Sequence, residues 1–385
     1  MQLEVIGVGG AGCRIAEAIR RSDPAEHSFV ADAFAFDTDS ASRVGLEAIP
    51  DSHRHRYGET SEGGLDGNLQ RGLAVGEEYV DELSRRLDAG SPSVADAFLV
   101  AVGLGGATGG GTVPHLVGNL QTLYDAPVYV LATLPARREL EPPPGNDGRA
   151  DADGHVRPMA EENAVRTLDR LDGLANAVIC FDNESWLKRG ETVADVRDRL
   201  NRELAARVAA FFSATADAGG GADGAAETIV DASDVGRILG SGTDVATIGY
   251  GTQRVETDGG GSRFGLGLFS SEPSVETSEA VSAVETSVGK ALRGKLTLEC
   301  EPANASRAML VVGGPPAWLN RRAIADGRRT IESATGSSEI LGGDAPRPDG
   351  EDVFAVVVLA GVDPVSRLEA LRSRTRPLDR GRRDA

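Results

Sequence analysis

The sequence predicts an α/β protein with two domains, a parallel sheet flanked by helices and a smaller α+β domain after it. Three observations support this prediction. Short apolar segments alternate with segments of helical periodicity through the first 190 residues, which is typical of a parallel sheet covered on both faces. A long amphipathic segment follows at residues 193–212. After residue 234 the chain changes to several strand-like segments with two helical segments between them.

The first half of the chain begins with an apolar strand at residues 3–6 and a glycine turn at residues 7–12. Ile15, Ala16 and Ile19 then recur at helical spacing. The alternation continues with predicted strands at residues 29–36, 97–102, 128–133 and 177–181, and with predicted helices at residues 73–87, 112–123 and 159–171. Residues 136–156 are rich in Pro, Gly and Asp, so we expect an exposed loop there.

The helix at residues 193–212 is long enough to act as a spine between two domains, and the glycines at 219–224 predict a flexible break after it. In the last part we expect strands at residues 263–270, 295–300, 307–312 and 353–362, and helices at residues 277–292 and 319–333. The predicted organisation is a nucleotide-binding domain at 1–190, the long helix and an acidic loop at 191–236, an α+β domain at 237–370 and a flexible tail at 371–385.

Charge and cysteine content narrow the functional classes. The chain has 40 Lys plus Arg residues and 59 Asp plus Glu residues, and its net charge of −19 would repel a nucleic-acid backbone. No run of about 18 apolar residues and no signal-peptide pattern is present, so we expect a cytoplasmic protein. Cys13, Cys180 and Cys300 are too scattered for a disulfide framework or a zinc site. We therefore expect no metal bound by the protein alone.

The basic residues include only three lysines, Lys188, Lys290 and Lys295. Strong acidity with so few lysines favours a cytoplasm rich in salt, where a carboxylate surface stays hydrated and its self-repulsion is screened. The alternative is an ordinary acidic protein from a GC-rich genome, which explains the preference for Arg but not the excess of acid.

The turn Gly7-Val8-Gly9-Gly10-Ala11-Gly12 fits the dinucleotide fingerprint, because its glycines let backbone N–H groups approach a pyrophosphate at a helix N-terminus. Asp37 or Asp39, at the end of the next strand, is then a candidate to hold a ribose. By itself the turn fits an NAD enzyme, another nucleotide site or a tight turn without a ligand. The second glycine cluster at residues 103–111 contains Thr108 and favours one phosphate site with two backbone walls.

The cluster Gly103-Leu104-Gly105-Gly106-Ala107-Thr108-Gly109-Gly110-Gly111 resembles the signature loop of the tubulin and FtsZ superfamily, and residues 6–12 resemble the first phosphate loop of FtsZ. Further landmarks follow in the family order: Gly64, Gly67, Asn68 and Gly72; Arg157; the segment Cys180-Phe181-Asp182-Asn183-Glu184; Asn201; and Asp231-Ala232-Ser233-Asp234-Val235. The acidic composition and the mixture of FtsZ-like and tubulin-like segments resemble CetZ, the tubulin-like group of haloarchaea. The resemblance covers roughly residues 1–370.

This resemblance implies a cytoskeletal GTPase that polymerises head to tail and takes part in the control of cell shape. GTP or GDP, with Mg²⁺, would be its ligand. The phosphates would lie at Gly9, Gly10, Gly12, Cys13, Gly67, Asn68, Gly105, Gly106, Ala107, Thr108 and Gly109, and the ribose and base at Arg14, Glu139, Arg157, Asn183 and Asn201. Asp231 and Asp234 of the adjacent subunit would be the catalytic acids. The implied partner is a second copy of the chain, with related tubulin-like proteins as further candidates.

Some residues depart from the family pattern. Ala107 replaces a glycine, and a methyl group would cost about 1 kcal/mol or more if that position needs a positive φ. Ile229 replaces an asparagine before the acidic pair, and Cys13 and Arg14 replace side chains close to the nucleotide. We therefore expect weaker binding or slower hydrolysis.

Two further hypotheses remain open. The chain is either a nucleotide-binding scaffold that regulates related filaments with little turnover, or a nicotinamide-dependent oxidoreductase, which leaves the second glycine loop unexplained. In addition, residues 372–385 contain six arginines, which predicts a solvated tail or a contact with an anionic membrane or acidic partner.

Overall fold

The computed structural model describes residues 1–39, 45–58, 64–140, 157–215, 230–240, 242–256 and 275–375. Its strands form one ten-stranded sheet in the order β3-β2-β1-β4-β5-β6-β7-β10-β8-β9. The bounds of the strands are β1 Leu3–Val8, β2 Val30–Asp37, β3 Arg54–Arg56, β4 Ala97–Gly103, β5 Val128–Leu134, β6 Ala177–Asp182, β7 Asp244–Arg254, β8 Ala305–Gly314, β9 Ile340–Pro346 and β10 Asp352–Val362.

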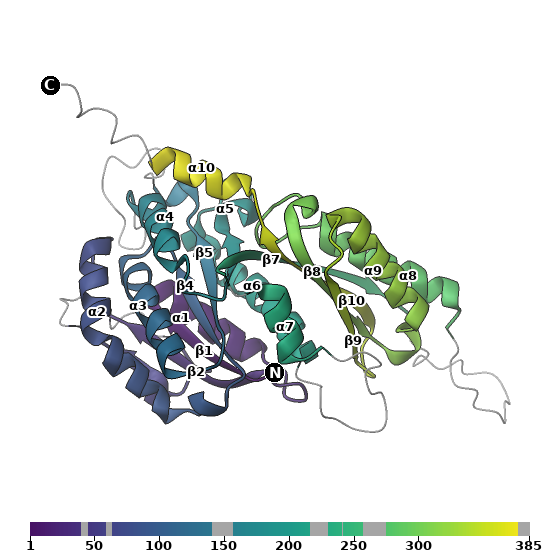
Figure 1. The fold of residues 1–385 in the computed structure, drawn as a ribbon, viewed down its shortest axis with the longest axis horizontal. Coiled ribbons are helices and arrows are strands. Elements are labelled where there is room, and N and C mark those ends of the chain that lie inside the picture. Colours follow the sequence, from purple (N-terminus) through teal and green to yellow (C-terminus); the bar gives the residue numbers. More distant parts are fainter. Residues whose placement is uncertain are drawn as a thin grey trace.

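All neighbouring pairs from β3 to β7 in the sheet order are parallel, whereas β10 is antiparallel to both of its neighbours, β7 and β8. The predicted parallel sheet is therefore confirmed for the first domain. The pairing of β6 with β7 carries the sheet into the second domain without a break. The two domains share one sheet, and the long helix lies across their junction (Figure 1).

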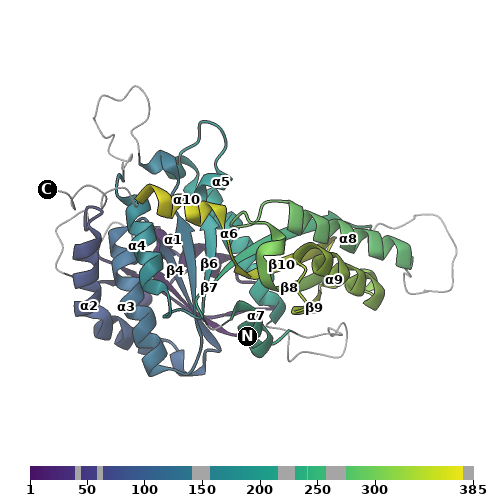
Figure 2. The same ribbon diagram turned by 45° about the horizontal axis from the view of Figure 1, so that its top comes forward.

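The helices of the described residues are α1 Gly9–Ser22, α2 Leu69–Arg86, α3 Ala107–Leu123, α4 Ala160–Leu171, α5 Asn183–Trp186, α6 Val193–Thr215, α7 Ala232–Leu239, α8 Thr277–Arg293, α9 Arg321–Thr335 and α10 Ser366–Thr375. One face of the sheet packs against α2, α3, α4, α8 and α9, and the other against α1, α6 and α7. Both views show this division (Figures 1 and 2). Among the described residues, no helix combines the length and apolarity needed to cross a membrane.

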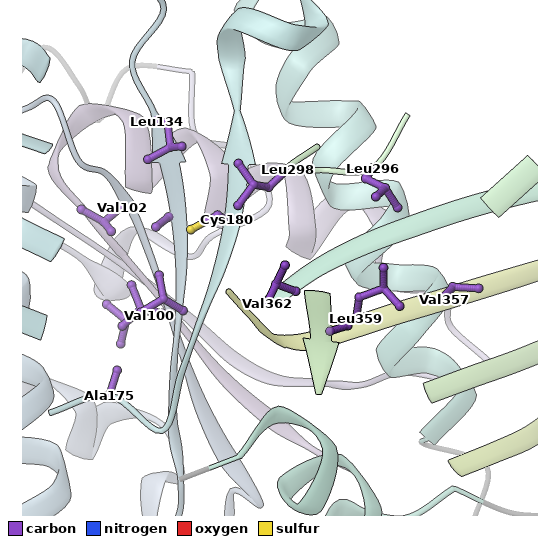
Figure 3. Packing of buried hydrophobic residues seen from close by; sticks show 14 of the residues in the cluster. Val100, Val102, Leu134, Ala175, Cys180, Leu296, Leu298, Val357, Leu359 and Val362 are labelled. Carbon is purple, nitrogen blue, oxygen red and sulfur yellow. The ribbon is translucent and has the colours of Figure 1, made fainter. Parts of the chain in front are cut away.

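The apolar layer on the α2–α4 face continues across the domain junction. Val100 of β4, Cys180 of β6 and Val362 of β10 belong to one buried cluster that also includes Leu298 (Figure 3). Burial of this apolar surface is the main favourable contribution to folding. The second domain is therefore held to the first by a common core as well as by strand pairing.

Three strands that the sequence did not predict are β3, β7 and β9, and the two longer ones, β7 and β9, contain glycines. In β7, a Cβ on Gly249 would lie 2.1 Å from the carbonyl oxygen of Ala291, and one on Gly251 would lie 2.2 Å from that of Ser287. Glycine inside this strand therefore marks the close approach of α8 and not a turn.

The predicted strand at residues 295–300 is wrong, because the segment is joined to β7 by one backbone bond, from the N–H of Thr297 to the carbonyl oxygen of Ile248 at 3.0 Å, and by side-chain bonds, and it forms no regular ladder. The Thr297 hydroxyl accepts from the backbone N–H of Ile248 at 2.9 Å, and the Thr247 hydroxyl accepts from that of Leu298 at 2.9 Å. The predicted strand at 263–270 and the break at 219–224 lie outside the described residues.

The predicted start of the flexible tail at residue 371 is also wrong, because residues 371–375 belong to α10 and Leu371 is buried. Arg374 of this helix forms two hydrogen bonds to Glu161, and Arg372 lies 4.0 Å from Asp169. Two of the six arginines of the tail are therefore paired with acids of α4, and the other four lie outside the described residues.

Candidate functional site

The two glycine loops meet at the carboxyl ends of β1 and β4. Gly9, the first residue of α1, has φ +73°, which lies in the left-handed region that favours glycine. A Cβ on Gly9 would lie 2.9 Å from the backbone nitrogen of Gly109, and a Cβ on Gly109 would lie 2.8 Å from the carbonyl oxygen of Val8. Because the two backbones are this close, the N-termini of α1 and α3 lie side by side.

Within the described residues, no side chain caps the N-terminus of α1 or α3. The N-cap residues Val8 and Gly106 make no side-chain cap bond, and no acidic residue stands in the first turn of α1 or α3. The first N–H groups of both helices and the positive ends of their dipoles are therefore available to an anion.

Two residues expected at the phosphates are packed beneath the first loop. A Cβ on Gly12 would lie 2.2 Å from the carbonyl oxygen of Ala101, so this glycine permits α1 to approach the sheet. The Cys13 side chain is fully buried, and its thiol lies 3.6 Å from the carbonyl oxygen of Gly7 and 3.5 Å from that of Phe36. Burial raises the pKa of this thiol well above its ordinary value. The Cys13 side chain thus points away from any ligand of the loop.

Ala107 is the first residue of α3, and its φ is not positive. Among the described non-glycine residues, only Asp66 and Thr243 have positive φ. The strain expected from its methyl group is therefore absent. The Thr108 hydroxyl, one residue further on, is hydrogen bonded to the Thr38 hydroxyl at 2.9 Å.

The loop that contains Gly64 and Gly67 is joined to the second glycine loop by a residue that the sequence analysis missed. Asn163 of α4 is 2% exposed, and its side-chain amide donates to the carbonyl oxygens of Gly67 at 3.0 Å and Gly105 at 3.2 Å. Asn68 caps α2 by accepting from the backbone N–H of Arg71 at 3.1 Å. A buried asparagine on the apolar face of α4 was the only sequence signal for this bridge.

The two other glycines expected in the loop of Gly67 have different surroundings. Gly64 has φ +78°, as a turn requires. Gly72 is buried in α2, and a Cβ there would lie 2.0 Å from the carbonyl oxygen of Ala107. Gly72 therefore serves the contact between α2 and α3.

Three of the residues expected at the ribose and base come together, namely Glu139, Arg157 and Asn183, whereas Asn201 lies on α6. Glu139 hydrogen bonds to the Asn183 side chain and accepts from the backbone N–H of Ala136 at 2.9 Å. The backbone N–H of Arg157 donates to the carbonyl oxygen of Glu139 at 2.6 Å. Burial raises the pKa of the Glu139 carboxyl, against the opposing effect of these partners.

Three arginines converge on this face. Burial lowers the pKa of Arg14, the neighbouring charges of Arg197 and Arg157 lower it further, and the charge of Asp37 opposes this effect. None of the three forms an ion pair within the described part of the chain. The sequence analysis missed Arg197, although it precedes Asn201 by four residues on α6 and so lies on the same helix face.

The two acids expected to be catalytic lie at the opposite end of the sheet. The Met1 amine donates to the carbonyl oxygen of Thr215 at 2.7 Å, which places the end of α6 at the start of β1. Helix α7 lies at this end as well (Figures 1 and 2). Gly9 stands at the other end of β1, about 20 Å away for a strand of this length. Asp231 and Asp234 therefore do not meet the glycine loops of their own chain.

Asp231 and Asp234 cap α7 reciprocally. The Asp231 carboxylate accepts from the backbone N–H of Asp234 at 2.9 Å, and the Asp234 carboxylate accepts from that of Asp231 at 3.3 Å. Asp231 is exposed and Asp234 is half-buried. Ile229, expected to weaken this loop, lies outside the described residues.

Comparison with known proteins gives matches over both parts of the chain. The GTPase domain of the Tubulin/FtsZ family matches residues 2–146, and the C-terminal domain of tubulin-like CetZ matches residues 190–377. Tubulin-like protein CetZ5 of Haloferax volcanii is 33% identical, over 100% of this chain and 94% of the relative. CetZ1 of the same organism is 35% identical, over 97% of this chain and 91% of the relative.

Solved structures show the same fold. The GDP-bound monomer of Haloferax volcanii CetZ1 superposes with a TM-score of 0.79 at 31% identity, covering 97% of this chain and 98% of that one. The GTPγS-bound protofilament of CetZ2 from the same organism has a TM-score of 0.79 at 27% identity, covering 98% of both chains. The predicted fold and the resemblance drawn from the two glycine loops are thus confirmed. The chain belongs to the tubulin-like CetZ family of the tubulin and FtsZ superfamily.

Proposed function

We propose that this protein binds a guanine nucleotide between its glycine loops and α6, and hydrolyses GTP between subunits of a head-to-tail filament. The observation that carries the proposal is the convergence of Arg14, Arg157 and Arg197, which form no ion pair within the described residues, beside two uncapped helix N-termini. Arg14 is half-buried, whereas Arg157 and Arg197 are exposed. Like charges brought together repel one another, and a phosphate group relieves this repulsion.

The phosphates would bind the backbone N–H groups of Gly9, Gly10, Gly105, Gly106, Thr108 and Gly109. Asn183 and Asn201 would hydrogen bond to the guanine edge, because an amide both donates and accepts. A base with a different edge would leave these groups unmatched and bind more weakly. The GDP and GTPγS bound to the CetZ1 and CetZ2 structures support this assignment.

Mg²⁺ would accompany the nucleotide. Within the described residues, no three His, Cys, Asp or Glu side chains are grouped to hold a metal ion, so phosphate oxygens would supply most of its ligands. The paired hydroxyls of Thr38 and Thr108 are oxygen groups of the type that Mg²⁺ accepts. When bound, the ion would spread the negative charge of the phosphates.

The catalytic acids would come from the next subunit. Asp231 is exposed at the end of the molecule opposite the glycine loops, so a head-to-tail contact brings it to a neighbour's nucleotide. There the two carboxylates would orient and polarise the attacking water. The protofilament of the CetZ2 structure supports this mode of assembly.

A second candidate function is a nucleotide-binding scaffold that regulates related filaments with little turnover. The observation in its favour is the reciprocal cap of Asp231 and Asp234, which already engages one oxygen of each carboxylate. The nicotinamide-dependent oxidoreductase is disfavoured by the family membership.

Phosphate release in molar KCl separates the two candidates. We expect the GTPase rate per subunit of the wild type to rise with protein concentration, and Asp231→Asn to abolish this rise while keeping the helix cap, since Asn is also a good N-cap residue. Asp349→Asn, at another exposed site, is the matched control and is expected to behave as wild type. A negligible rate at every concentration, together with tight GTP binding, would favour the scaffold.

The identity of the bound nucleotide tests the site itself. Chromatography of the nucleotide released from purified wild-type protein is expected to give GDP or GTP. Recovery of an adenine or nicotinamide nucleotide would contradict the guanine assignment.

We further propose that the filament is cytoplasmic, works at high salt and contributes to cell shape. The net charge of −19 supports the salt requirement, because screening must reduce repulsion between acidic subunits before they assemble. Light scattering with GTP is expected to increase with KCl concentration, and cells lacking the protein are expected to change shape. Assembly with related tubulin-like proteins, or a membrane contact of the terminal arginines, would appear as co-sedimentation with those proteins or with anionic vesicles.

A further inference from the structure

Helix α10, at the C-terminal end of the described chain, lies over α4 and close to the end of β6 (Figures 1 and 2). Its residue Arg367 has a side chain that is 12% exposed. The guanidinium donates to the Asp182 carboxylate at 3.1 Å and to the carbonyl oxygen of Pro135 at 2.7 Å, and it lies 3.7 Å from the Glu161 carboxylate. One planar group therefore contacts three separate elements.

Two of these contacts immediately precede residues of the proposed base site. Pro135 is followed by Ala136, whose N–H holds the Glu139 carboxylate at 2.9 Å. Asp182 is followed by Asn183, which hydrogen bonds to Glu139. Arg367 thus joins the segment after β5 to the segment after β6 just before they form this pair.

Asp182 has a second structural task. It is the N-cap of α5, and its carboxylate accepts from the backbone N–H of Glu184 at 3.3 Å. Its side chain is 7% exposed, so removal of Arg367 would leave a buried carboxylate without its cationic partner. Arg367 therefore contacts the carboxylate that caps α5, directly before Asn183 in the chain.

The third contact reaches the phosphate loops. Glu161 is in the first turn of α4 and also accepts two hydrogen bonds from Arg374, at 2.9 and 2.6 Å. In the same turn, the Asn163 amide bridges the carbonyl oxygens of Gly67 and Gly105. Helix α10 thus holds the start of α4, which in turn holds two loops.

We propose that Arg367 is a positioning residue for guanine recognition. It does not itself touch the nucleotide but sets the distance between the segments that carry Glu139 and Asn183. Two hydrogen-bond acceptors and an ion-pair partner on three segments of the chain require the planar fork of arginine, which a lysine does not reproduce. This inference rests on the proposed nucleotide site and adds to it the C-terminal helix.

Base selectivity is the decisive measurement. We would determine the dissociation constants of GDP and IDP by calorimetry in molar KCl, because IDP lacks only the exocyclic amino group of guanine. Arg367→Met is expected to raise the dissociation constant of GDP about tenfold, because displacement of the segments that carry Glu139 and Asn183 would weaken binding by about one hydrogen bond to the base, and to reduce the preference for GDP over IDP. Arg367→Lys is expected to lie between the wild type and Arg367→Met.

Arg372→Met is the matched control on the same helix, since in the described part of the chain the Arg372 side chain forms only a surface ion pair with Asp169, at 4.0 Å. It is expected to leave both dissociation constants unchanged. A lower melting temperature of Arg367→Met with an unchanged preference for GDP would show a merely structural role and overturn the proposal.

Hydrogen exchange of the nucleotide-free protein gives a readout that needs no ligand. Arg367→Met is expected to speed amide exchange at residues 136–140 and 183–186 while leaving β1 and α1 as in the wild type. Exchange as slow as in the wild type at both segments would overturn the positioning role. If the wild type binds neither GDP nor IDP, both the proposed nucleotide site and this inference are wrong. If the wild type and Arg367→Met both prefer GDP over IDP to the same extent, the nucleotide site stands and only this inference is wrong.

Discussion

The two ends of the first domain differ in how their charged side chains are paired. At the cationic end, Arg14, Arg157 and Arg197 form no ion pair within the described residues, and the two helices beside them have no side-chain cap. At the acidic end, Asp231 and Asp234 satisfy each other's backbone N–H groups. The cationic end is therefore incomplete without an anion, whereas the acidic end is stable as it stands.

A buried carboxyl belongs to the acidic end as well. Glu4, near the start of β1, is fully buried and stands in register with Asp32 of β2. Neither Glu4 oxygen has a hydrogen-bond partner among the described residues. Burial, together with the charge of Asp32, raises the pKa of Glu4 to about 8. The raised pKa thus keeps the Glu4 carboxyl protonated and uncharged near neutral pH.

The largest expected effect is the pH dependence of the free energy of unfolding that Glu4 causes at the acidic end. Between its ordinary pKa of 4.5 and the folded value of about 8, the folded state holds a proton that the unfolded chain has released. The free energy of unfolding therefore falls as pH rises, with a limiting slope of about 1.4 kcal/mol per pH unit. Glu4→Gln is expected to remove this slope and to be more stable than wild type at pH 9, by on the order of 5 kcal/mol.

Denaturant titrations of both proteins at pH 5, 7 and 9 in constant KCl measure this effect. Identical pH profiles would mean that Glu4 ionises in the folded state as easily as in the unfolded chain.

Gly12→Ala tests the packing beneath the cationic end. A Cβ there would lie 2.2 Å from the Ala101 carbonyl oxygen, so α1 must move, at an expected cost of about 2 kcal/mol in unfolding free energy. Gly67→Ala is the control, because Gly67 has φ +70° but a Cβ added there would meet no atom within 4 Å, and its expected cost is about 1 kcal/mol. Equal losses in urea titrations would contradict the close approach of α1 to the sheet.

Arg14→Met is expected to act with opposite signs on stability and binding. Removal of a desolvated cation from two like charges should leave the nucleotide-free protein at least as stable as wild type, whereas GDP affinity should fall about tenfold because a charged phosphate contact is lost. Calorimetry and thermal unfolding measure the two effects. Arg20→Met, on the same helix but paired with Asp23, should leave GDP affinity unchanged, and an equal loss in that variant would argue against a specific anion contact.

The smallest expected effect concerns the cap at the acidic end. Asp231→Ala removes the N-cap of α7 and is expected to cost about 1 kcal/mol, whereas Asp231→Asn should cost only a fraction of this. Urea titration of the nucleotide-free variants gives the difference. If the two variants are equally stable, the carboxylate does not act as a cap in solution.

The elements with strong local patterns were predicted well. Strands β1, β4 and β5 and helices α4 and α8 were found within a few residues, because apolar periodicity and glycine turns are properties of the local sequence. Helix α3 begins five residues earlier than predicted, at Ala107, because its glycines form helix turns packed against α2 and not a loop. Strand β7 was missed for the related reason that its glycines accommodate α8.

By itself, the sequence determined the two glycine loops, the alternation of strand and helix, the family and the excess of acid. All of these depend on residues that are close together in the chain or on composition. Only the tertiary structure decided that Arg197 joins Arg14, that Asn163 bridges two loops and that Arg367 reaches across more than 180 residues to Asp182. A side chain's partner in space depends on how distant elements pack, and no local pattern encodes that contact.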